Sequence, residues 1–354
     1  MISNSHHQSW AWDLYWKADR LQSCVPQNSA GSGDAAAALD AAWMAWFASL
    51  PAKTRLLDVG TGNGALAALA VQSARERKAD FTIDAVDAAD IDPVQYVKTG
   101  GEALQSVRFH PRTLMQKLPF DDGTFTAISG QYALEYAPID EAVPEILRVL
   151  APGGAFRFLI HASDSALMAH SRQQMTQLQM IEDSGLIALM REQIPAIRNM
   201  EQRVQHLRTS GTLNAHDSHA LKAKAREASQ SLSIAVARLV RDGTALGAGD
   251  IFKAFMESAG WLFEQRHRLD DAAIKALIDE IDLKRAARHQ RLSALLAAAH
   301  DEDQGRALRD LFARHGRRRH GRRRQGEGER VAISPAIFGT QQIKLGWWLT
   351  GNRS

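Results

Sequence analysis

A chain of 354 residues with 45% hydrophobic content is long enough to bury a large core in one elaborated domain or two, so disorder is not the default. Its single cysteine, Cys24, excludes an internal disulfide and a cysteine-based zinc site. The net charge of +3 is concentrated, because residues 314–330 hold eight arginines and two glutamates and leave the rest of the chain at −3. The body of the chain therefore has no broad basic face of the kind that binds nucleic acid.

Membrane insertion, export and metal binding are also not indicated. No stretch of eighteen apolar residues occurs, and the first ten residues lack the basic start, apolar middle and cleavage site of an export signal. We therefore expect a soluble, cytoplasmic protein. The histidines are scattered and the acidic residues show no metal-ligand spacing, so no metal site is expected.

The first expected elements are helices within residues 1–48, divided by a Gly/Ser-rich break. Asp34 is placed to cap the second helix, whose Ala, Leu and Trp positions recur at three- and four-residue spacing. This spacing predicts an amphipathic helix. Five of the eight tryptophans lie in this segment: Trp10, Trp12, Trp16, Trp43 and Trp46.

Residues 54–70, TRLLDVGTGNGALAALA, predict a strand, a tight turn and a helix. A short apolar run ends in three alternating glycines, Gly60, Gly62 and Gly64, and passes directly into an Ala- and Leu-rich segment. The glycines permit positive φ and close approach of the backbone to a ligand, and the free amides at the helix start near Ala65 can bind polar groups. The sequence therefore predicts a nucleotide-type cofactor site at this turn.

The kind of cofactor is a separate question, because the turn also satisfies the dinucleotide fingerprint G-x-G-x-x-A. Two carboxylates favour another cofactor. Asp58 stands two residues before the first glycine, where it suits the amino-acid end of a ligand better than a pyrophosphate. Asp87 ends a second predicted strand, Phe81–Val86, where it is placed to accept both hydroxyls of a ribose.

With VGTGNG at 59–64, LPFDDGTF at 118–125 and EILRVLAPGG at 145–154 in this order, the chain resembles the class I S-adenosylmethionine (SAM)-dependent methyltransferases, most closely those of small molecules. The resemblance covers residues 49–162 and 301–354. It implies an α/β fold, a Rossmann-like doubly wound sheet of seven strands, with SAM as the cofactor. It also implies methyl transfer to an oxygen or nitrogen of a small-molecule acceptor.

The resemblance divides the chain into an N-terminal helical cover, a SAM-binding core at 49–162, a helical insertion at 163–300, and a last helix with a strand hairpin at 301–354. The insertion is rich in Ala, Leu, Arg, Gln and Met at helical spacing, which predicts four to six helices between strand five and the last helix. It is interpreted as a lid that shapes acceptor specificity or as the arm of a homodimer. The Arg-rich loop 314–330 is expected to be a solvated loop, with docking of nucleic acid or a phosphorylated acceptor as the alternative.

The other elements follow from apolar runs and breakers. Further strands are expected at Val107–His110, Thr124–Ser129, Ala155–Ile160, Val331–Ile337 and Ile343–Leu349. Further helices are expected from Pro93 to Gly100, at Pro144–Leu150, at Asp270–Ala299 and at Asp301–Phe312.

The resemblance implies that the loops at the carboxyl ends of the strands hold the cofactor. In this scheme Asp58 and the glycine turn bind the methionine end of SAM, Asp87 binds the ribose, and the loop after the third strand binds the adenine. Many relatives have an Asp where Leu114 stands, so another group must contact the adenine amino group. The expected cofactor-binding residues are Asp58, Gly60, Thr61, Gly62, Asn63, Gly64, Asp87, Ala88, Leu114, Met115, Gln116, Gly130 and Gln131.

A hydroxyl or amine acceptor needs a base to remove its proton. His161, at the carboxyl end of strand five, is the preferred general base, and a histidine bonded to a neighbouring loop is the alternative. Glu135 and Tyr132, which follow strand four, are the other candidate bases, and for Glu135 the alternative is a carboxylate favoured by a helix dipole. The resemblance also implies that four aromatic side chains form a wall of the acceptor pocket, here called the substrate wall. For those in the N-terminal helices, Trp12, Tyr15 and Trp16, plain core packing is the alternative. The residues of the substrate wall are Trp12, Tyr15, Trp16 and Tyr136.

Two other functions stay open. An RNA or protein methyltransferase would use the Arg-rich loop for docking, although GQYA at 130–133 replaces the Asn/Asp-Pro-Pro-aromatic signature of base and glutamine methylases. A non-catalytic scaffold would keep the SAM-binding fold and dimerise through the helical insertion.

Overall fold

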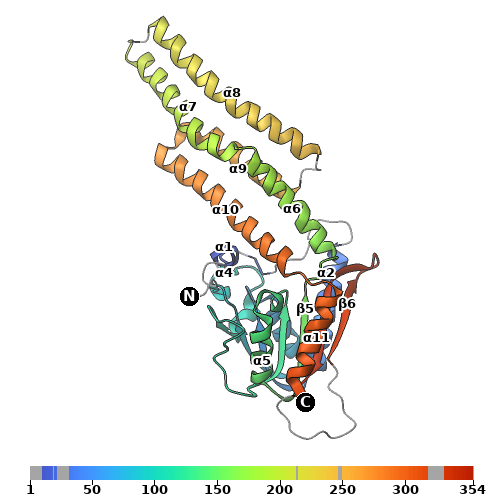
Figure 1. Ribbon diagram of the computed structural model, residues 1–354. Helices are drawn as coiled ribbons and strands as arrows, with labels where there is room; N and C mark the ends of the chain where they lie inside the picture. Colours follow the sequence, from blue (N-terminus) through green and yellow to red (C-terminus); the bar gives the residue numbers. More distant parts are fainter. Residues whose placement is uncertain are drawn as a thin grey trace. The chain divides into compact units, whose positions relative to one another are not determined.

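The computed structural model describes residues 10–18, 20–21, 32–212, 214–245, 249–317 and 331–353. The chain divides into two compact units (Figure 1). The core unit comprises Met1–Ser171 and Ser293–Ser354, and the helical unit comprises Arg172–Leu292. Cys24 and residues 318–330 of the Arg-rich loop lie outside the described residues.

The core unit is built on a seven-stranded sheet in the order β3-β2-β1-β4-β5-β7-β6. Its strands are β1 (Lys53–Val59), β2 (Asp80–Val86), β3 (Val107–His110), β4 (Phe125–Gln131), β5 (Leu150–Ile160), β6 (Ala332–Phe338) and β7 (Ile343–Asn352). Strands β1 to β5 pair in parallel, and β7 runs antiparallel to both β5 and β6. The prediction of a Rossmann-like seven-stranded sheet is confirmed.

Helices cover both faces of the sheet. On one face lie α2 (Ser32–Ser49) and α3 (Ala65–Arg77), and on the other lie α5 (Ile139–Val149) and α11 (Glu302–Arg317). The buried residues of α2, Ala35, Leu39, Trp43 and Phe47, recur every four positions and therefore share one side of the helix. On the opposite face, Phe312 of α11 packs against Phe156 and Phe158 of β5. Two apolar layers thus hold the sheet whose strand ends carry the candidate site.

Short elements complete this unit: α1 (Trp10–Trp16), α4 (Pro93–Tyr96) and the 3-10 helices η1 (Glu102–Ser106) and η2 (Leu134–Tyr136). Several predicted boundaries were wrong, and among them α11 runs on to Arg317 and β7 to Asn352. The helix opened by Pro93 ends at Tyr96, and α5 begins at Ile139, since acidic residues fill its first turn. Strand β5 begins at Leu150, because Gly153 N and Gly154 O bond with Arg353 and extend the pairing.

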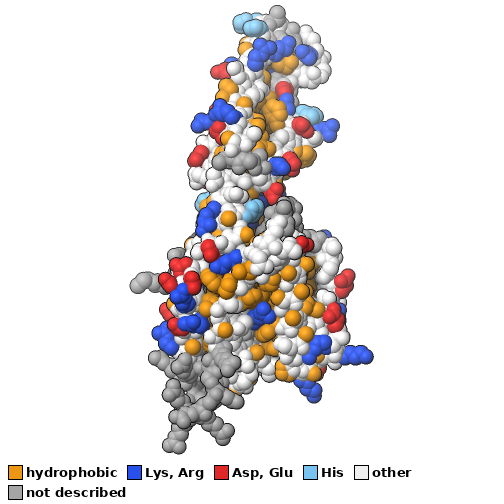
Figure 2. All heavy atoms as spheres, turned by 90° about the vertical axis from the view of Figure 1, so that its right-hand side faces the viewer, with side chains coloured by type: hydrophobic (Ala, Val, Ile, Leu, Met, Phe, Trp, Pro, Cys, Tyr) orange, Lys and Arg blue, Asp and Glu red, His pale blue; other side chains and the backbone are white. Residues whose placement is uncertain are grey.

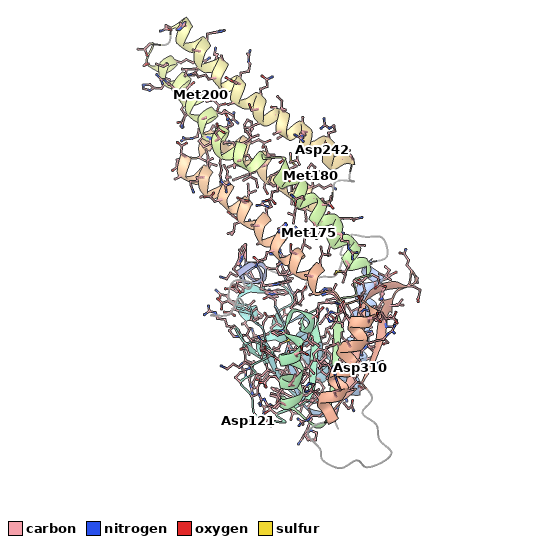
Figure 3. All side chains as sticks on the ribbon, viewed as in Figure 1. Asp121, Met175, Met180, Met200, Asp242 and Asp310 are labelled. Carbon is pink, nitrogen blue, oxygen red and sulfur yellow. The ribbon has the colours of Figure 1, made fainter. Side chains whose placement is uncertain are left out.

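The helical unit contains α7 (Leu186–Thr209), α8 (Ala215–Ala245), α9 (Asp250–Gln265) and the 3-10 helix η3 (Arg266–Arg268). It also contains most of α6 (Ala166–Asp183) and α10 (Asp271–Ala298). It has a hydrophobic core of its own, against which Met175 and Met180 of α6 and Met200 of α7 pack partly buried (Figure 3). The helices α6 to α10 confirm the predicted helical insertion.

Charged side chains are spread along the surface of the helical unit, with hydrophobic side chains between them (Figure 2). Ion pairs there include Arg191 with Asp282 at 2.8 Å and Lys275 with Asp279 at 2.6 Å. In the described part of the chain, no helix has both the length and the apolar content to cross a membrane. Within the same residues, no group of three or more His, Cys, Asp and Glu side chains is arranged to hold a metal ion.

Candidate cofactor and acceptor site

The glycine turn after β1 lies at the centre of the candidate site. Gly60, Gly62 and Gly64 have φ values of +65°, +54° and +82°, which side chains with a Cβ rarely adopt. A Cβ on Gly62 would lie 2.4 Å from the ring of Trp16, and one on Gly60 would lie 2.2 Å from Cβ of Ala133. Both the conformation and the available space therefore require glycine at Gly60 and Gly62.

Asp58 lies in β1 just before the turn and is 1% exposed. The Ser129 hydroxyl on β4 donates to its Oδ1 at 2.8 Å, while its buried Oδ2 has no hydrogen-bond partner among the described residues. Burial raises the pKa of Asp58 to about 7; the nearby hydroxyls of Thr61 and Ser129 oppose this rise, and the charge of Asp87 adds to it. Such a carboxyl group is well placed to bind a cationic donor.

Asp87 follows β2 and joins two loops. Its Oδ2 accepts a hydrogen bond from Gly62 N at 2.7 Å, and its Oδ1 accepts one from Ala89 N at 2.8 Å. Burial raises the pKa of Asp87, while these two backbone hydrogen bonds lower it. Each carboxylate oxygen can accept a further hydrogen bond. Asp87 therefore fixes the glycine turn and retains the capacity to bind ribose hydroxyls.

The loop after β3 is tied to Asp87 through the main chain. Thr113 N donates to Asp87 O at 2.7 Å, and Asp87 N donates to His110 O at 3.2 Å. Met115 reaches the turn, since its Cε would lie 3.1 Å from a Cβ on Gly60. Leu114 and Gln116 are its chain neighbours, half-buried like Met115, and Ala88 is exposed on the loop after β2. The structure thus brings Met115 to the glycine turn and leaves Ala88 at the surface.

Helix α1 brings aromatic rings to the same turn. Trp16, 7% exposed, packs on Gly62, and Trp12 stacks with Trp16 at 6.2 Å between ring centroids. Trp12 also meets Tyr136 edge-on at 5.9 Å, and Tyr15 meets Trp16 edge-on at 4.8 Å. All four rings of the expected substrate wall therefore form one cluster, which contacts the turn through Trp16.

A buried acid–histidine pair lies at the ends of β4 and β5. The side chains of Glu135 and His161 are both 0% exposed, with His161 Nδ1 at 2.7 Å from Glu135 Oε1. The same Oε1 accepts a hydrogen bond from His161 N at 2.7 Å. Tyr132 stacks on the imidazole at 4.2 Å, and its hydroxyl donates to Leu345 O at 3.1 Å. The ring of Tyr132 thus orients the imidazole, while its hydroxyl is engaged by β7.

Two further expected cofactor residues end β4. Gly130 is closely packed, since a Cβ there would lie 3.0 Å from both Phe158 and Val59. The side-chain oxygen of Gln131 accepts a hydrogen bond from Trp43 Nε1 of α2 at 2.6 Å. The structure therefore directs the Gln131 carboxamide oxygen to α2.

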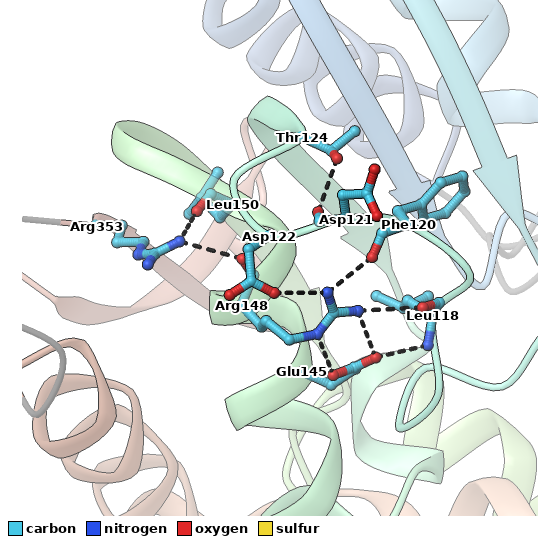
Figure 4. Close-up of polar contacts among 9 residues, drawn as sticks. All are labelled: Leu118, Phe120, Asp121, Asp122, Thr124, Glu145, Arg148, Leu150 and Arg353. Carbon is cyan, nitrogen blue, oxygen red and sulfur yellow. Dashed lines mark hydrogen bonds and ion pairs between the residues drawn. The ribbon is translucent and has the colours of Figure 1, made fainter.

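Arg148 holds the two remaining motif segments together (Figure 4). Its guanidinium pairs with Glu145 at 2.7 Å and with Asp122 at 2.9 Å, and it donates to the carbonyl oxygens of Leu118 and Phe120. The hydrogen bond from Arg148 holds the pKa of Glu145 below its ordinary value. The segments LPFDDGTF and EILRVLAPGG therefore stabilise the loop before β4.

Sequence reasoning missed some residues of the site. Ser129 pairs with Asp58 in the register of β1 and β4, so a known strand order would have placed it beside this carboxyl group. Asp13 of α1 accepts a hydrogen bond from Asp90 N at 2.8 Å, across 77 positions of the chain. No local pattern signals a contact of that separation.

The residues present fit SAM. Several buried polar atoms without a hydrogen-bond partner among the described residues surround the turn and the acid–histidine pair: Asp58 Oδ2, Thr61 Oγ1, Asn63 Oδ1 and Glu135 Oε2. All four can accept hydrogen bonds. SAM carries an ammonium, ribose hydroxyls, an adenine amino group and a sulfonium charge, which are the donors and the positive charge that such atoms bind.

Comparisons with known proteins give matches to the part of the chain that contains Asp58, the glycine turn and Asp87. Residues 57–158 match the family model described as a methyltransferase domain. The chain is 50% identical over 42 residues to a sterol 4-C-methyltransferase of Caenorhabditis elegans, covering 12% of this chain and 13% of that protein. The solved structure of the YcgJ protein from Bacillus subtilis is 24% identical, with 40% of this chain and 58% of that chain covered and a TM-score of 0.31. A geranyl diphosphate methyltransferase is 18% identical, with coverages of 35% and 44% and a TM-score of 0.30. The chain spans less than two thirds of the length of each of these relatives.

Proposed function

Because residues 57–158 of this chain are a methyltransferase domain of the class I SAM-dependent family, we propose that the protein transfers a methyl group from SAM to an oxygen or nitrogen of a small-molecule acceptor. The observation that carries the proposal is the convergence of Asp58 and Asp87 on one glycine turn, next to the ends of β4 and β5 where Glu135 and His161 pair. The two aspartates suit the cofactor, and the carboxylate–imidazole pair suits the acceptor.

SAM supplies an electrophilic methyl group on a sulfonium whose leaving group departs neutral. Asp58 would hold the ammonium of the methionine end, and Asp87 would hold the ribose hydroxyls while it fixes the turn through Gly62 N. Met115, which lies next to Gly60, would border the adenine. Positioning of the acceptor and exclusion of water supply most of the rate in such a displacement. The burial of the turn and of the acid–histidine pair serves both.

The Glu135–His161 pair removes the proton of the acceptor. Nε2 of His161 would accept the proton that the acceptor oxygen or nitrogen loses when the methyl group leaves the sulfur and bonds to it. Glu135 Oε1, 2.7 Å from Nδ1, stabilises the charged imidazole, and Tyr132 holds the ring by stacking. This arrangement is that of a general base oriented by a carboxylate.

Two observations support a small acceptor. The proposed base is fully buried, and Tyr136 and Trp12 stand edge-on along the path from the imidazole to α1, so the acceptor has to fit among these rings. The sterol methyltransferase matched over 42 residues also acts, by its name, on a small molecule.

Calorimetry with SAM and S-adenosylhomocysteine tests the proposal. We expect binding by the wild-type protein and a loss of about a hundredfold in affinity for Asp87→Ala, because two charge-assisted hydrogen bonds that shape the turn disappear. Asp80→Ala is the matched control, since Asp80 is an exposed carboxylate at the other end of β2. Absence of binding by the wild-type protein contradicts the proposal and favours the scaffold.

An RNA or protein acceptor that docks on the Arg-rich loop is tested by deletion of residues 316–326. Unchanged turnover of a small-molecule acceptor, together with unchanged SAM affinity, is the result expected here. A selective loss of turnover on RNA or protein would favour the macromolecular acceptor.

We also propose that the helical unit forms a homodimer. A groove of about 490 Å³ between α6, α9 and α10 has an apolar base, and Trp261, 52% exposed, stands at its edge. Glu257, Glu280, Lys284 and Arg288 line the same groove, so a two-fold arrangement sets acids of one copy against bases of the other. Light scattering is expected to show a dimer that Trp261→Ala weakens. Leu283→Ala, at an exposed apolar position outside the groove lining, is the control, and a monomeric wild-type protein contradicts the proposal.

A further inference from the structure

The side chain of Asn63 makes two hydrogen bonds that play no part in the proposed methyl transfer. It lies between Gly62 and Gly64 in the cofactor turn and is 0% exposed. Its Nδ2 donates to the carbonyl oxygens of both Trp16, at 2.9 Å, and Arg20, at 2.8 Å. Carbonyl groups at the end of a helix have no partner within the helix. One carboxamide of the turn therefore satisfies two carbonyl groups at and just beyond the end of α1.

A second contact holds the middle of α1. Asp13 Oδ1 accepts a hydrogen bond from Asp90 N at 2.8 Å, and Asp90 belongs to the loop after β2 that Asp87 begins. An isolated helix of seven residues is not stable in water. Hydrogen bonds to two loops around the cofactor site, at the middle and at the end of the helix, therefore help to hold α1 in place alongside the packing of its rings.

The position of α1 decides access to the turn. The ring of Trp16 packs directly on Gly62, and Thr61, Gly62, Asn63 and Gly64 are all buried. A turn that binds a cofactor through its backbone must open to admit it. Because Trp16 covers Gly62, α1 has to move for the turn to open.

We propose that Asn63 is a positioning residue that latches α1 over the cofactor turn and thereby sets the rate at which the cofactor leaves. The identity of the cofactor rests on the proposed function, but the latch itself rests only on the contacts of Asn63 and Asp13. Because Asn63 is part of the turn, a cofactor that orders the turn also tightens the hold on α1.

Hydrogen exchange of the protein without added cofactor tests the latch. Asn63→Asp keeps the size of the side chain but cannot donate to the two carbonyl groups, and Asn63→Ala removes it. In both variants the amides of residues 10–18 are expected to exchange about tenfold faster, the size expected for the loss of such hydrogen bonds. The α3 amides should not change, and Gln72→Ala, which removes an exposed carboxamide of α3, should behave as wild type. Exchange of residues 10–18 in Asn63→Asp within twofold of wild type would overturn the latch.

Asp13→Ala provides an independent variant if the turn does not tolerate changes at Asn63. It removes the other attachment of α1 while leaving every side chain of the turn intact. The same acceleration of exchange over residues 10–18 is expected, and its absence would overturn the two-point attachment.

The release of S-adenosylhomocysteine, followed by stopped-flow tryptophan emission, tests the consequence. The dissociation rate constant is expected to rise about tenfold in both Asn63→Asp and Asp13→Ala. Asp13 is not part of the turn, and Asn63 is intact in Asp13→Ala. A faster release from this variant therefore cannot be caused by the loss of a contact between Asn63 and the cofactor. In the double variant Asn63→Asp/Trp16→Ala, the effects are expected to be smaller than additive, since both act through α1.

The outcomes separate the two proposals. If α1 loosens in Asp13→Ala while the release rate stays at the wild-type value, the control of release by α1 is wrong. If the wild-type protein does not bind S-adenosylhomocysteine, the proposed function and the control of release both fail, and the exchange experiment still decides whether Asn63 holds α1.

Discussion

The core unit and the helical unit bury different kinds of side chain. Among the described residues of the core unit, Asp58, Asp84, Glu135 and His161 are all at most 6% exposed. In the described part of the helical unit, the buried polar side chain is Gln177, and the carboxylates there are half-buried or exposed. Burial of an ionisable group costs free energy unless a partner satisfies it. The difference therefore indicates that the core unit carries the chemistry.

The helical unit follows a simpler rule. Its core is aliphatic and aromatic, and its charges form surface pairs such as Lys284 with Glu280 at 2.6 Å and Arg191 with Asp279 at 3.2 Å. Surface pairs of this kind contribute little to stability. Its stability should then depend on apolar packing and helix propensity, whereas that of the core unit should also depend on single buried polar groups.

Glu135→Ala is expected to have the largest effect on stability. It leaves the main-chain N–H of His161 and the buried imidazole without their acceptor, which costs about 3 kcal/mol in the free energy of unfolding. Urea denaturation measures this change. Glu135→Ala is also expected to lose most of its methyltransferase activity, because the proposed base His161 then lacks its carboxylate partner.

Lys275→Ala is the matched change in the helical unit. It removes one partner of Asp279 from an exposed pair outside the groove, and the urea midpoint is expected to stay within the error of the measurement. Equal destabilisation by the two substitutions would contradict the distinction between the units.

Arg148→Met should have the next largest effect. The side chain is 21% exposed and bonds to Glu145, Asp122 and two carbonyl groups, so its loss is expected to cost about 2 kcal/mol. Thermal denaturation checks the change. Arg191→Met, which removes a more exposed arginine that also contacts two carboxylates, is expected to leave the melting temperature nearly unchanged. A larger loss from Arg191→Met would show that surface pairs do stabilise the helical unit.

The raised pKa of Asp58 predicts a pH dependence that the helical unit cannot produce. Since this pKa is about 7, the ionised fraction of Asp58 rises about tenfold between pH 6 and pH 8. If the carboxylate binds the ammonium of SAM, the dissociation constant falls about tenfold over the same range. Calorimetry at several pH values measures it, and Asp58→Asn should remove most of the dependence.

The same group affects the stability of the protein without cofactor in the opposite direction. Folded Asp58, with its pKa raised to about 7, keeps its proton up to about that pH, whereas in the unfolded chain the group has its ordinary pKa of 3.8. The unfolded state then binds fewer protons between these values, so this group's contribution to the free energy of unfolding falls as the pH rises from 4 to 7. A contribution that rises over this range, obtained by comparison with Asp58→Asn, would refute the assignment.

The parts of the site that sequence predicted are those whose residues stand close together in the chain. Asp58, the glycines and Asp87 each adjoin a strand end, and the parallel order of β1 and β2 places those ends side by side. The helices of the insertion followed from periodicity alone, which says nothing of how they pack.

The parts that sequence did not predict depend on distant contacts. The Nδ2 of Asn63 bonds to Trp16 O across 47 positions, Trp43 bonds to Gln131 across 88, and Tyr132 bonds to Leu345 across 213. Each depends on the order in which strands and helices assemble. Tyr132 was therefore predicted as a candidate base and Gln131 as a cofactor-binding residue, and only the fold shows that the Tyr132 hydroxyl bonds to Leu345 and the Gln131 oxygen to Trp43.

The smallest change in stability is expected from replacing a glycine of the helical unit by alanine. This substitution should stabilise the protein, whereas the same substitution in the glycine turn of the core unit should destabilise it. Gly260 lies inside α9, and a Cβ there would meet no atom within 4 Å. Gly260→Ala is therefore expected to raise the free energy of unfolding by about 0.5–1 kcal/mol, because alanine loses less conformational entropy in a helix. Gly62→Ala should destabilise the core unit, since its φ of +54° and the ring of Trp16 leave no room for a Cβ. Urea denaturation of both variants gives the two signs, and destabilisation by Gly260→Ala would mean that this face of α9 is covered, as a tightly packed partner would cover it.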